Sequence, residues 1–221
     1  LSRSGNITLF PNASEVGSFY EGLAKVKRNG KWGYIDQNMK FVIPPSYDFA
    51  RSFADGLANV SGKFGNDYYI DKSGEKIITN YGTDGSDFSE GLARFRNKYF
   101  GYGYMNTKGE VIIKAQFTYS CLFNYGLACA ESDGKWGYID KIGCFVIPAQ
   151  YDEAGDFSFD GVAVIRKNGK YGFINRRGLL IGAAQYDKAE WLGGLGLVEI
   201  DGTQQYRNIR GEVVWSSKGA E

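Results

Sequence analysis

The residue types that most often carry catalysis are either missing from this sequence or repeated at fixed positions. The chain contains no histidine, so a Ser-His-Asp triad, an imidazole metal site and histidine acid-base chemistry are all excluded. Aspartates instead recur in two sets, one after an apolar strand pattern and one after a tyrosine: Asp36, Asp71 and Asp140, and Asp48, Asp152 and Asp187. Turn capping explains the first set, and hydrogen bonds to local backbone amides explain the second.

A catalytic pair of carboxylates would have to converge from different parts of the chain, and the spacing of these aspartates gives no sign of one. The sequence also lacks a Gly-rich phosphate loop between a strand and a helix, and it lacks a nucleophile motif. We therefore expect a protein that is not an enzyme and that uses no cofactor.

The three cysteines could serve redox or metal chemistry. Cys121, Cys129 and Cys144 occupy the places that Arg51, Lys25 and Lys40 hold in an earlier stretch of similar sequence, so we expect them to face outward. Their odd number and the lack of C-x-x-C spacing argue against a disulfide framework and a zinc site, so no metal is expected. One bridge among them remains possible, because outward residues of adjacent strands come close.

Unpaired cysteines fit a reducing cytoplasm best, and a cell-envelope or secreted location would apply if a signal segment had been removed.

The composition argues against other classes of protein. A formal net charge of +1 over 221 residues lacks the basic excess that phosphate binding needs, so we expect no nucleic-acid partner. No apolar run approaches the roughly 18 residues of a membrane span. The 31 glycines, 16 tyrosines and 15 phenylalanines beside only 4 prolines favour strands joined by tight turns.

The chain repeats itself at intervals of about 34 residues, a period typical of solenoids and propellers. An aromatic residue begins each copy, and a glycine followed by a short apolar strand comes next, as in Gly22-Leu23-Ala24-Lys25-Val26. The aromatic positions are Phe19, Phe53, Phe88, Phe123, Phe157 and Trp191. We place a partial repeat at 6–18, full repeats at 19–52, 53–87, 88–122, 123–156 and 157–190, and a partial repeat at 191–215, all within one domain spanning 1–221.

Each copy reads as an antiparallel meander of three strands. Four copies place Asn-Gly or Asp-Gly between two apolar strands, the strongest short hairpin signal: Asn29-Gly30, Asp133-Gly134, Asn168-Gly169 and Asp201-Gly202. The second strand, Lys135–Asp140 in the fourth copy, leads into an Asx-to-Gly turn. The third strand is closed by Pro44 or Pro148, which marks a strand end or an edge. The connecting segment could pair as a short fourth strand, and no helix is needed.

Both faces of these strands are apolar, so each meander should pack between its neighbours. At the N-terminus, residues 7–11 match a third strand, while the C-terminal copy supplies the first two, so the two ends could pair and close a ring. The fold class we expect is all-β, with six tandem antiparallel β-meander repeats. A propeller-like closed ring is favoured over an open twisted β-solenoid.

The recurring string of Phe, Gly-Leu-Ala, Asn-Gly-Lys-Trp-Gly-Tyr-Ile-Asp, Val-Ile-Pro and Tyr-Asp resembles the bacterial WG-containing (KWG) repeat family. The first and fourth copies match best, with Trp32-Gly33 and Trp136-Gly137, and the other copies match less closely. The resemblance implies a bacterial β-repeat protein and brings no catalytic residues. A superficial likeness to cell-wall-binding hairpin repeats keeps a glycan-binding function open.

Repetition favours a rigid surface that binds another macromolecule, most often a protein, and a lectin-like module for glycans or cell-wall polymers is the alternative. The repeated Trp/Tyr-Gly-Tyr positions read as core. Irregular hairpin tips in the second and third copies should expose aromatic rings instead, and the first strand of each copy supplies one variable position. The candidate binding surface therefore comprises Phe64, Tyr68, Tyr99, Phe100, Lys25, Asn59 and Arg94.

Overall fold

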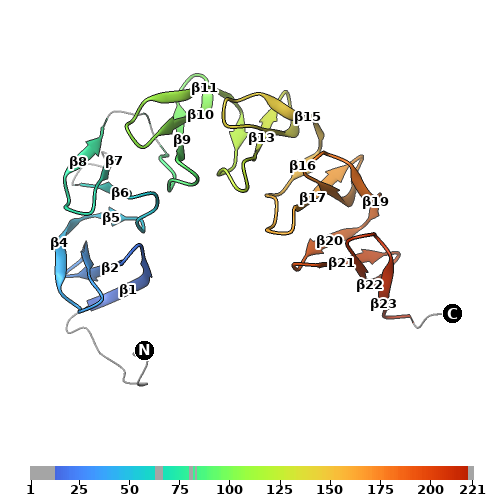
Figure 1. Cartoon of the computed structure of the whole chain (residues 1–221), viewed down its shortest axis with the longest axis horizontal. Coiled ribbons are helices and arrows are strands. Elements are labelled where there is room, and N and C mark those ends of the chain that lie inside the picture. The colour runs from blue at the N-terminus through green and yellow to red at the C-terminus, as the bar shows by residue number, and fades with distance from the viewer. Residues whose placement is uncertain (1–12, 63–66, 80–81, 83, 219–221) are drawn as a thin grey trace. The chain divides into compact units, whose positions relative to one another are not determined.

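The computed structural model describes residues 13–62, 67–79, 82 and 84–218, and within these ranges it contains strands and turns but no helix. The strands form six antiparallel sheets, each built from consecutive strands of the chain (Figure 1). An all-β fold of six repeated sheets, as the sequence predicts, is thus confirmed.

The first two sheets have four strands each, in the orders β1-β2-β3-β4 and β5-β6-β7-β8. Their bounds are β1 (Ala13–Tyr20), β2 (Leu23–Arg28), β3 (Lys31–Ile35), β4 (Phe41–Tyr47), β5 (Phe49–Ala50), β6 (Ala58–Ser61), β7 (Asp67–Ile70) and β8 (Lys76–Ile78). The third sheet has three strands in the order β11-β10-β9. These are β9 (Leu92–Asn97), β10 (Gly101–Asn106) and β11 (Val111–Phe117).

The last three sheets again have four strands in chain order. The fourth comprises β12 (Tyr119–Ser120), β13 (Ala128–Ser132), β14 (Lys135–Ile139) and β15 (Phe145–Tyr151). The fifth comprises β16 (Glu153–Ala154), β17 (Val162–Lys167), β18 (Lys170–Asn175) and β19 (Leu180–Tyr186). The sixth comprises β20 (Lys188–Trp191), β21 (Leu195–Ile200), β22 (Thr203–Asn208) and β23 (Val213–Ser216).

The segment after the third meander strand forms the first strand of the next sheet in four places, as β5, β12, β16 and β20, so the predicted fourth strand exists. These four sheets begin with the connecting segment and not with the aromatic residue that marks the sequence repeat. No sheet in the described ranges joins the two ends of the chain. The expected N-terminal partner strand, residues 7–11, lies outside those ranges, so ring closure stays a prediction.

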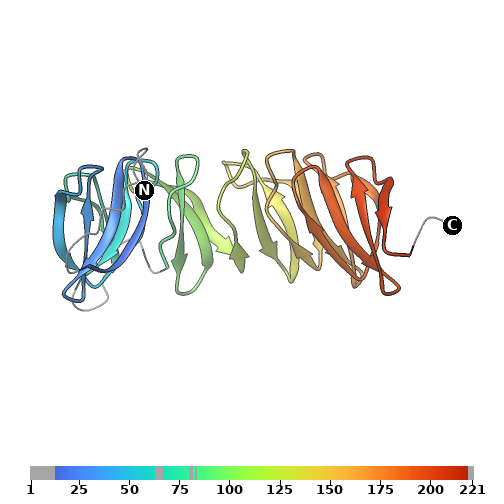
Figure 2. The ribbon, with the colours of Figure 1, turned by 90° about the horizontal axis from the view of Figure 1, so that it is seen from below.

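The chain divides into two compact units. The first takes the residues up to Lys98 together with Met105–Val111, and the second takes Tyr99–Tyr104 and everything from Ile112 onward. Within each unit, the turns lie at the two ends of each sheet (Figure 2). That the two units form one domain, as the repeat indicates, stays a prediction.

The third meander strand continues past its prolines, so of the two predicted possibilities, a strand end or an edge, the prolines mark an edge. β4 runs through Pro44 to Tyr47, and β15 runs through Pro148 to Tyr151. Both are edge strands, so a residue without an amide proton is tolerated on the open side. A register shift lies between the pairs Trp136↔Tyr151 and Tyr138↔Ile147, so the edge strand bulges at the proline.

The bulge explains why glycine follows tryptophan in the second strand. A Cβ at Gly137 would stand 2.5 Å from the Ile147 carbonyl oxygen and 2.7 Å from the Ala149 nitrogen. Gly33 and Gly103 face the same obstruction, from Ile43 and Ile113. Only glycine allows the edge strand to cross this closely.

In four copies the core contains a buried tyrosine that reaches toward the following repeat. Tyr138 is fully buried, its ring centroid lies 4.7 Å from that of Phe157, and its hydroxyl donates a 2.8 Å hydrogen bond to the Gly155 carbonyl. Three other copies repeat this hydroxyl-to-carbonyl bond over 17 residues: Tyr34 to Arg51, Tyr69 to Ser86 and Tyr104 to Cys121. The recurrent aromatics therefore join one repeat to the next, which confirms that the Tyr positions form core. Trp32 and Trp136 are half-buried at the margin of that core.

Candidate interaction surfaces

Chain order gives each four-stranded sheet two different rims. The turn between its first and second strands and the turn between its third and fourth strands lie at one end, which we call the paired-turn rim. The turn between its second and third strands lies at the other end, which we call the hairpin rim. Side chains at these turns are the parts of the molecule most open to a partner.

Carboxylates connect successive sheets along the paired-turn rim. Asp55 accepts a hydrogen bond from the Gly91 amide at 2.7 Å, and Glu21 accepts one from the Gly56 amide at 3.1 Å. Asp160 does the same for the Gly194 amide at 2.6 Å and also accepts the Trp191 indole N–H. Burial by itself would raise the pKa of Asp160, but the bonds from Ser158, Trp191 and Gly194 together hold it below its ordinary value. These acids are structural ties.

The paired-turn rim of the second unit is richer in exposed apolar side chains than that of the first. Large apolar side chains are exposed at five of its turns: Tyr125, Ile142, Phe159, Leu192 and Ile209. In the first unit Phe19 and Tyr20 are exposed beside the first turn, and the other turns carry exposed polar residues: Gln37, Asn38, Asp55, Lys72, Ser73 and Glu90. A series of exposed apolar side chains on successive turns is typical of a binding surface.

A hollow lies in this rim between two turns of the fifth sheet. Its lining residues are Phe159, Asp160, Gly161, Asn175, Arg176 and Arg177. The Arg176 guanidinium lies 4.9 Å from the centroid of the Tyr125 ring, a cation-π contact that fixes it beside the hollow. Phe159 is 70% exposed, and its ring lies beside Gly193, where an added Cβ would be 3.1 Å from Phe159 Cε1.

The charge of the hollow is set by its two arginines. Hydrogen bonds from three groups already engage the Asp160 carboxylate. Arg176 and Arg177 are both exposed, next to an exposed aromatic ring. The arrangement can pair with an anionic group while it packs against an apolar one.

Of the predicted surface residues, the pair at the third-copy hairpin tip is exposed as expected. Tyr99 is 78% and Phe100 66% exposed on the hairpin rim, with ring centroids 6.4 Å apart. Phe64 lies outside the described residues. Tyr68 is half-buried on β7 against the first core cluster, with Lys76 Nζ 4.1 Å from the centroid of its ring, so it is partly exposed, and its role in binding stays a prediction.

The predicted row on the first strands is less accessible than expected. Asn59 is buried, and Lys25 and Arg94 are half-buried. The Lys25 ammonium donates a 3.1 Å hydrogen bond to the Ala50 carbonyl and lies 4.9 Å from the Trp32 ring. Ala50 belongs to β5, the connecting segment that begins the next sheet, so this segment covers Lys25. Such a contact between repeats cannot be seen from the spacing within one repeat.

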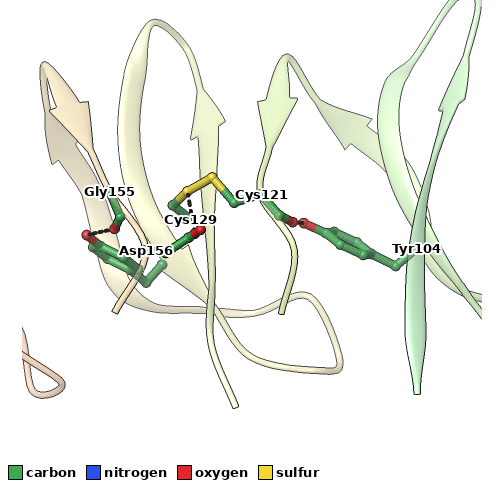
Figure 3. Close-up of a disulfide and its surroundings, with 6 residues drawn as sticks. Tyr104, Cys121, Cys129, Gly155 and Asp156 are labelled. Carbon is green, nitrogen blue, oxygen red and sulfur yellow. Dashed lines mark hydrogen bonds between the residues drawn. A yellow bond between two sulfur atoms is a disulfide. The ribbon is translucent and has the colours of Figure 1, made fainter. Parts of the chain in front are cut away.

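The cysteines require a correction for the same reason. Cys129 is buried, Cys121 is half-buried, and the two form a disulfide, whereas Cys144 is exposed as predicted. The Asp156 carboxylate lies 3.7 Å from Cys129 Sγ (Figure 3). Burial raises the pKa of Asp156. Because two of the three cysteines are paired, they no longer favour a reducing compartment.

The first set of repeated aspartates caps its own turns as predicted, whereas Asp152 and Asp187 of the second set accept amides of the next hairpin and not local ones. Asp36 accepts hydrogen bonds from the Asn38 and Lys40 amides in its turn, and these bonds lower its pKa, that from Lys40 most. Asp152 pairs with Lys135 at 2.6 Å and accepts the Gly169 amide at 3.0 Å. The Lys135 bond, then the Gly169 bond, lowers the pKa of Asp152. Its amide partner lies in the next hairpin, farther away than expected.

Comparison with known proteins identifies the family. The sequence profile described as WG containing repeat matches residues 4–32, 32–61, 102–136 and 136–171, more than half of the chain. The chain belongs to this family. Two of the matched segments end on Trp32 and Trp136. The glycine after each of these tryptophans, Gly33 or Gly137, is the residue over which the edge strand crosses.

The WG-repeat chain has a β-propeller-like fold. BamB from Moraxella catarrhalis matches it with a TM-score of 0.51 and 13% identity, over 91% of this chain and 72% of that one. Hsv2 from Kluyvelomyces marxianus matches with a TM-score of 0.54 and 11% identity, over 90% and 76%. A search of curated protein sequences found no match. No helix in the described ranges of the WG-repeat chain is long and apolar enough to cross a membrane.

Proposed function

We propose that this WG-repeat protein is a non-enzymatic interaction module that binds a segment of another protein in the hollow of the fifth sheet. The observation that carries the proposal is that Arg176 and Arg177 line the same hollow as the exposed Phe159 side chain. Arginine beside an aromatic ring is the composition that interface hot spots favour.

The partner segment should be acidic and should carry at least one aromatic or aliphatic side chain. An Asp or Glu of the partner would pair with the guanidinium of Arg177, and its apolar side chain would cover Phe159 and the neighbouring Tyr125. The turns on either side add two exposed cations, Lys141 and Arg210, the latter close to the exposed Glu212. These side chains would speed the encounter with an acidic segment.

Selection from a displayed peptide library on the immobilised protein tests the proposal. Enriched peptides should be acidic with an interspersed apolar residue, and the affinity of a labelled peptide, measured by fluorescence anisotropy, should fall as salt rises. Arg177→Glu should weaken binding by about tenfold or more, the loss that a close charge pair typically carries. Lys108→Glu is the matched control, because Lys108 holds the same turn position in the third sheet. Peptides with no acidic preference, or equal effects of the two variants, would contradict the proposal.

Glycan binding is the second candidate, and the exposed ring pair at the opposite rim favours it. Tyr99 and Phe100 present two aromatic rings to solvent, which sugars use as stacking platforms. Co-sedimentation with insoluble cell-wall polysaccharide in high salt distinguishes the two functions. Pelleting that a soluble sugar competes away would favour glycan binding, and its absence would favour the protein partner.

A further inference from the structure

Cys121, Cys129 and Asp156 form a compact cluster away from the proposed peptide site. One sulfur from each cysteine and one carboxylate oxygen all lie within 4.8 Å of one another (Figure 3). It is the single cluster of three potential metal-ligating side chains of this type within the described ranges. Cys121 directly follows β12 and Cys129 lies on β13, both in the fourth sheet. Asp156 lies between β16 and β17 of the fifth sheet.

The disulfide is not what holds these two segments together. The Cys121 amide donates a 2.8 Å hydrogen bond to the Cys129 carbonyl, and three other copies make the same backbone bond between residues that have no sulfur. These pairs are Arg51 to Asn59, Ser86 to Arg94 and Gly155 to Val164. Reduction should therefore leave the strand pairing in place and release two thiols at a preformed position.

The Asp156 carboxylate, the third group of the cluster, lies close to the cysteine sulfurs. Asp156 Oδ1 lies 3.7 Å from Cys129 Sγ, which has no proton to donate while it is bridged, so this contact becomes a hydrogen bond only after reduction. The Asp156 side chain is exposed, which leaves room for a water ligand.

The distances fit a tetrahedral ion. Zinc binds thiolate sulfur at about 2.3 Å and carboxylate oxygen at about 2.0 to 2.2 Å, so the two ligand atoms of a tetrahedral site stand roughly 3.5 Å apart. The sulfur and oxygen here are 3.7 Å apart. The two cysteine Cα atoms are 5.2 Å apart, so their sulfurs can separate to about 3.8 Å by side-chain rotation.

We propose that the reduced chain binds one zinc ion through Cys121, Cys129 and Asp156, with water as the fourth ligand, and that the disulfide form does not bind it. A phosphine reductant would give two electrons to the bridge and take an oxygen atom from water. The two protons of that water would complete the thiols. Zinc would then displace both thiol protons into solvent. The same two sulfurs would thus hold either the bridge or the ion.

Titration of the phosphine-reduced chain with Co²⁺, the coloured probe for zinc sites, tests the proposal. We expect one equivalent of Co²⁺ to produce thiolate-to-metal absorption and strong tetrahedral d–d bands, and Zn²⁺ to abolish both. The oxidised chain should show neither signal. Cys144→Ser should bind Co²⁺ as the wild type does, because Cys144 lies outside the cluster.

Two variants separate loss of ligands from loss of fold. Cys129→Ser should abolish the thiolate absorption, and Asp156→Asn, at an exposed position that the fold tolerates, should weaken Co²⁺ binding by about tenfold to a hundredfold. Circular dichroism melts of both variants report folding independently. Absence of the absorption in the reduced wild type would overturn the proposal. So would a signal that survives Cys129→Ser or disappears with Cys144→Ser.

Discussion

The hydroxyl of Tyr138 donates a 2.8 Å hydrogen bond to the carbonyl oxygen of Gly155, 17 residues further along the chain. Tyr138 is an interior residue of the fourth sheet, and Gly155 lies where the fifth sheet begins. Burial, followed by the nearby Tyr151 and Asp156, raises the pKa of the phenol far above its ordinary value, so it stays protonated and able to donate above the pH at which an exposed tyrosine ionises. This bond is the repeated device that fastens one repeat to the next.

Removal of that hydroxyl should weaken the chain without disturbing its packing. We expect Tyr138→Phe to lower the free energy of unfolding by about 1 kcal/mol, because the ring still packs on Phe157 and only the hydrogen bond is lost. Urea denaturation measures the change. Tyr171→Phe is the control, since its hydroxyl meets Glu153 at an exposed site. Equal losses for the two variants would refute this role for the buried hydroxyl.

The crossing of the edge strand makes a second prediction about stability. Gly137→Ala would force a Cβ to within 2.5 Å of the Ile147 carbonyl oxygen, so the backbone of the edge strand must move, and we expect a loss of about 3 kcal/mol. Gly134→Ala is the matched control in the adjoining hairpin. There the φ angle of 72° is strained for alanine but nothing lies within 4 Å, so the loss should be about 1 kcal/mol. A smaller effect at Gly137 than at Gly134 would contradict the crossing.

The dependence of stability on pH should follow the aspartate ties. The pKa of Asp152 is lowered in the folded chain, so its contribution is complete above the unfolded value of about 3.9 and is lost as the pH falls through the folded value. The melting temperature should therefore hold nearly constant from pH 7 to pH 5 and fall below about pH 4. Asp152→Asn should lower the melting temperature at pH 7 and reduce the acid slope.

Ionisation of Asp156 should change the stability in the opposite direction. Its pKa is raised by burial, so ionisation opposes folding as the pH rises above about 3.9, and Asp156→Asn should maintain or raise the melting temperature of the metal-free chain at pH 7. A decrease of the same size for Asp152→Asn and Asp156→Asn would contradict both assignments.

The exposed rings at the hairpin tip test which surface matters. Tyr99→Ala and Phe100→Ala should leave the melting temperature within about 1 °C, since both side chains are mostly in solvent. They should also leave the affinity for a selected acidic peptide unchanged, because the tip lies on the opposite rim. Loss of retention on polysaccharide in these variants, together with an unchanged fold, would support the glycan alternative instead.

The sequence predicts the parts of the fold that one repeat determines by itself. Asn168-Gly169 and its equivalents demand a tight hairpin, and the spacing that places an aromatic residue at the position of Tyr138 in every copy marks that position as core. The third strand was harder to delimit. Pro148 lacks an amide proton and reads as a stop, yet the bulge at an edge carries the strand on to Tyr151.

Contacts between repeats could not be predicted in the same way. Cys129 and Asn59 look outward within their own repeat, but the connecting segment covers them. The hollow was missed because Phe159 and Arg177 come from two turns that only the sheet brings together. A signal did exist, since Phe157-Ser158-Phe159-Asp160-Gly161 is one residue longer than the same turn in the other copies.

The most direct test of the interaction site is to map a selected acidic peptide onto the ¹⁵N-labelled chain by amide chemical-shift perturbation. The largest shifts should fall at the turns that line the hollow, around Gly161, Asn175 to Gly178 and Gly193. The same peptide should leave these amides unmoved in Arg177→Glu. Shifts centred on Tyr99 to Gly101, or unchanged by Arg177→Glu, would show that the hollow is not where the partner binds.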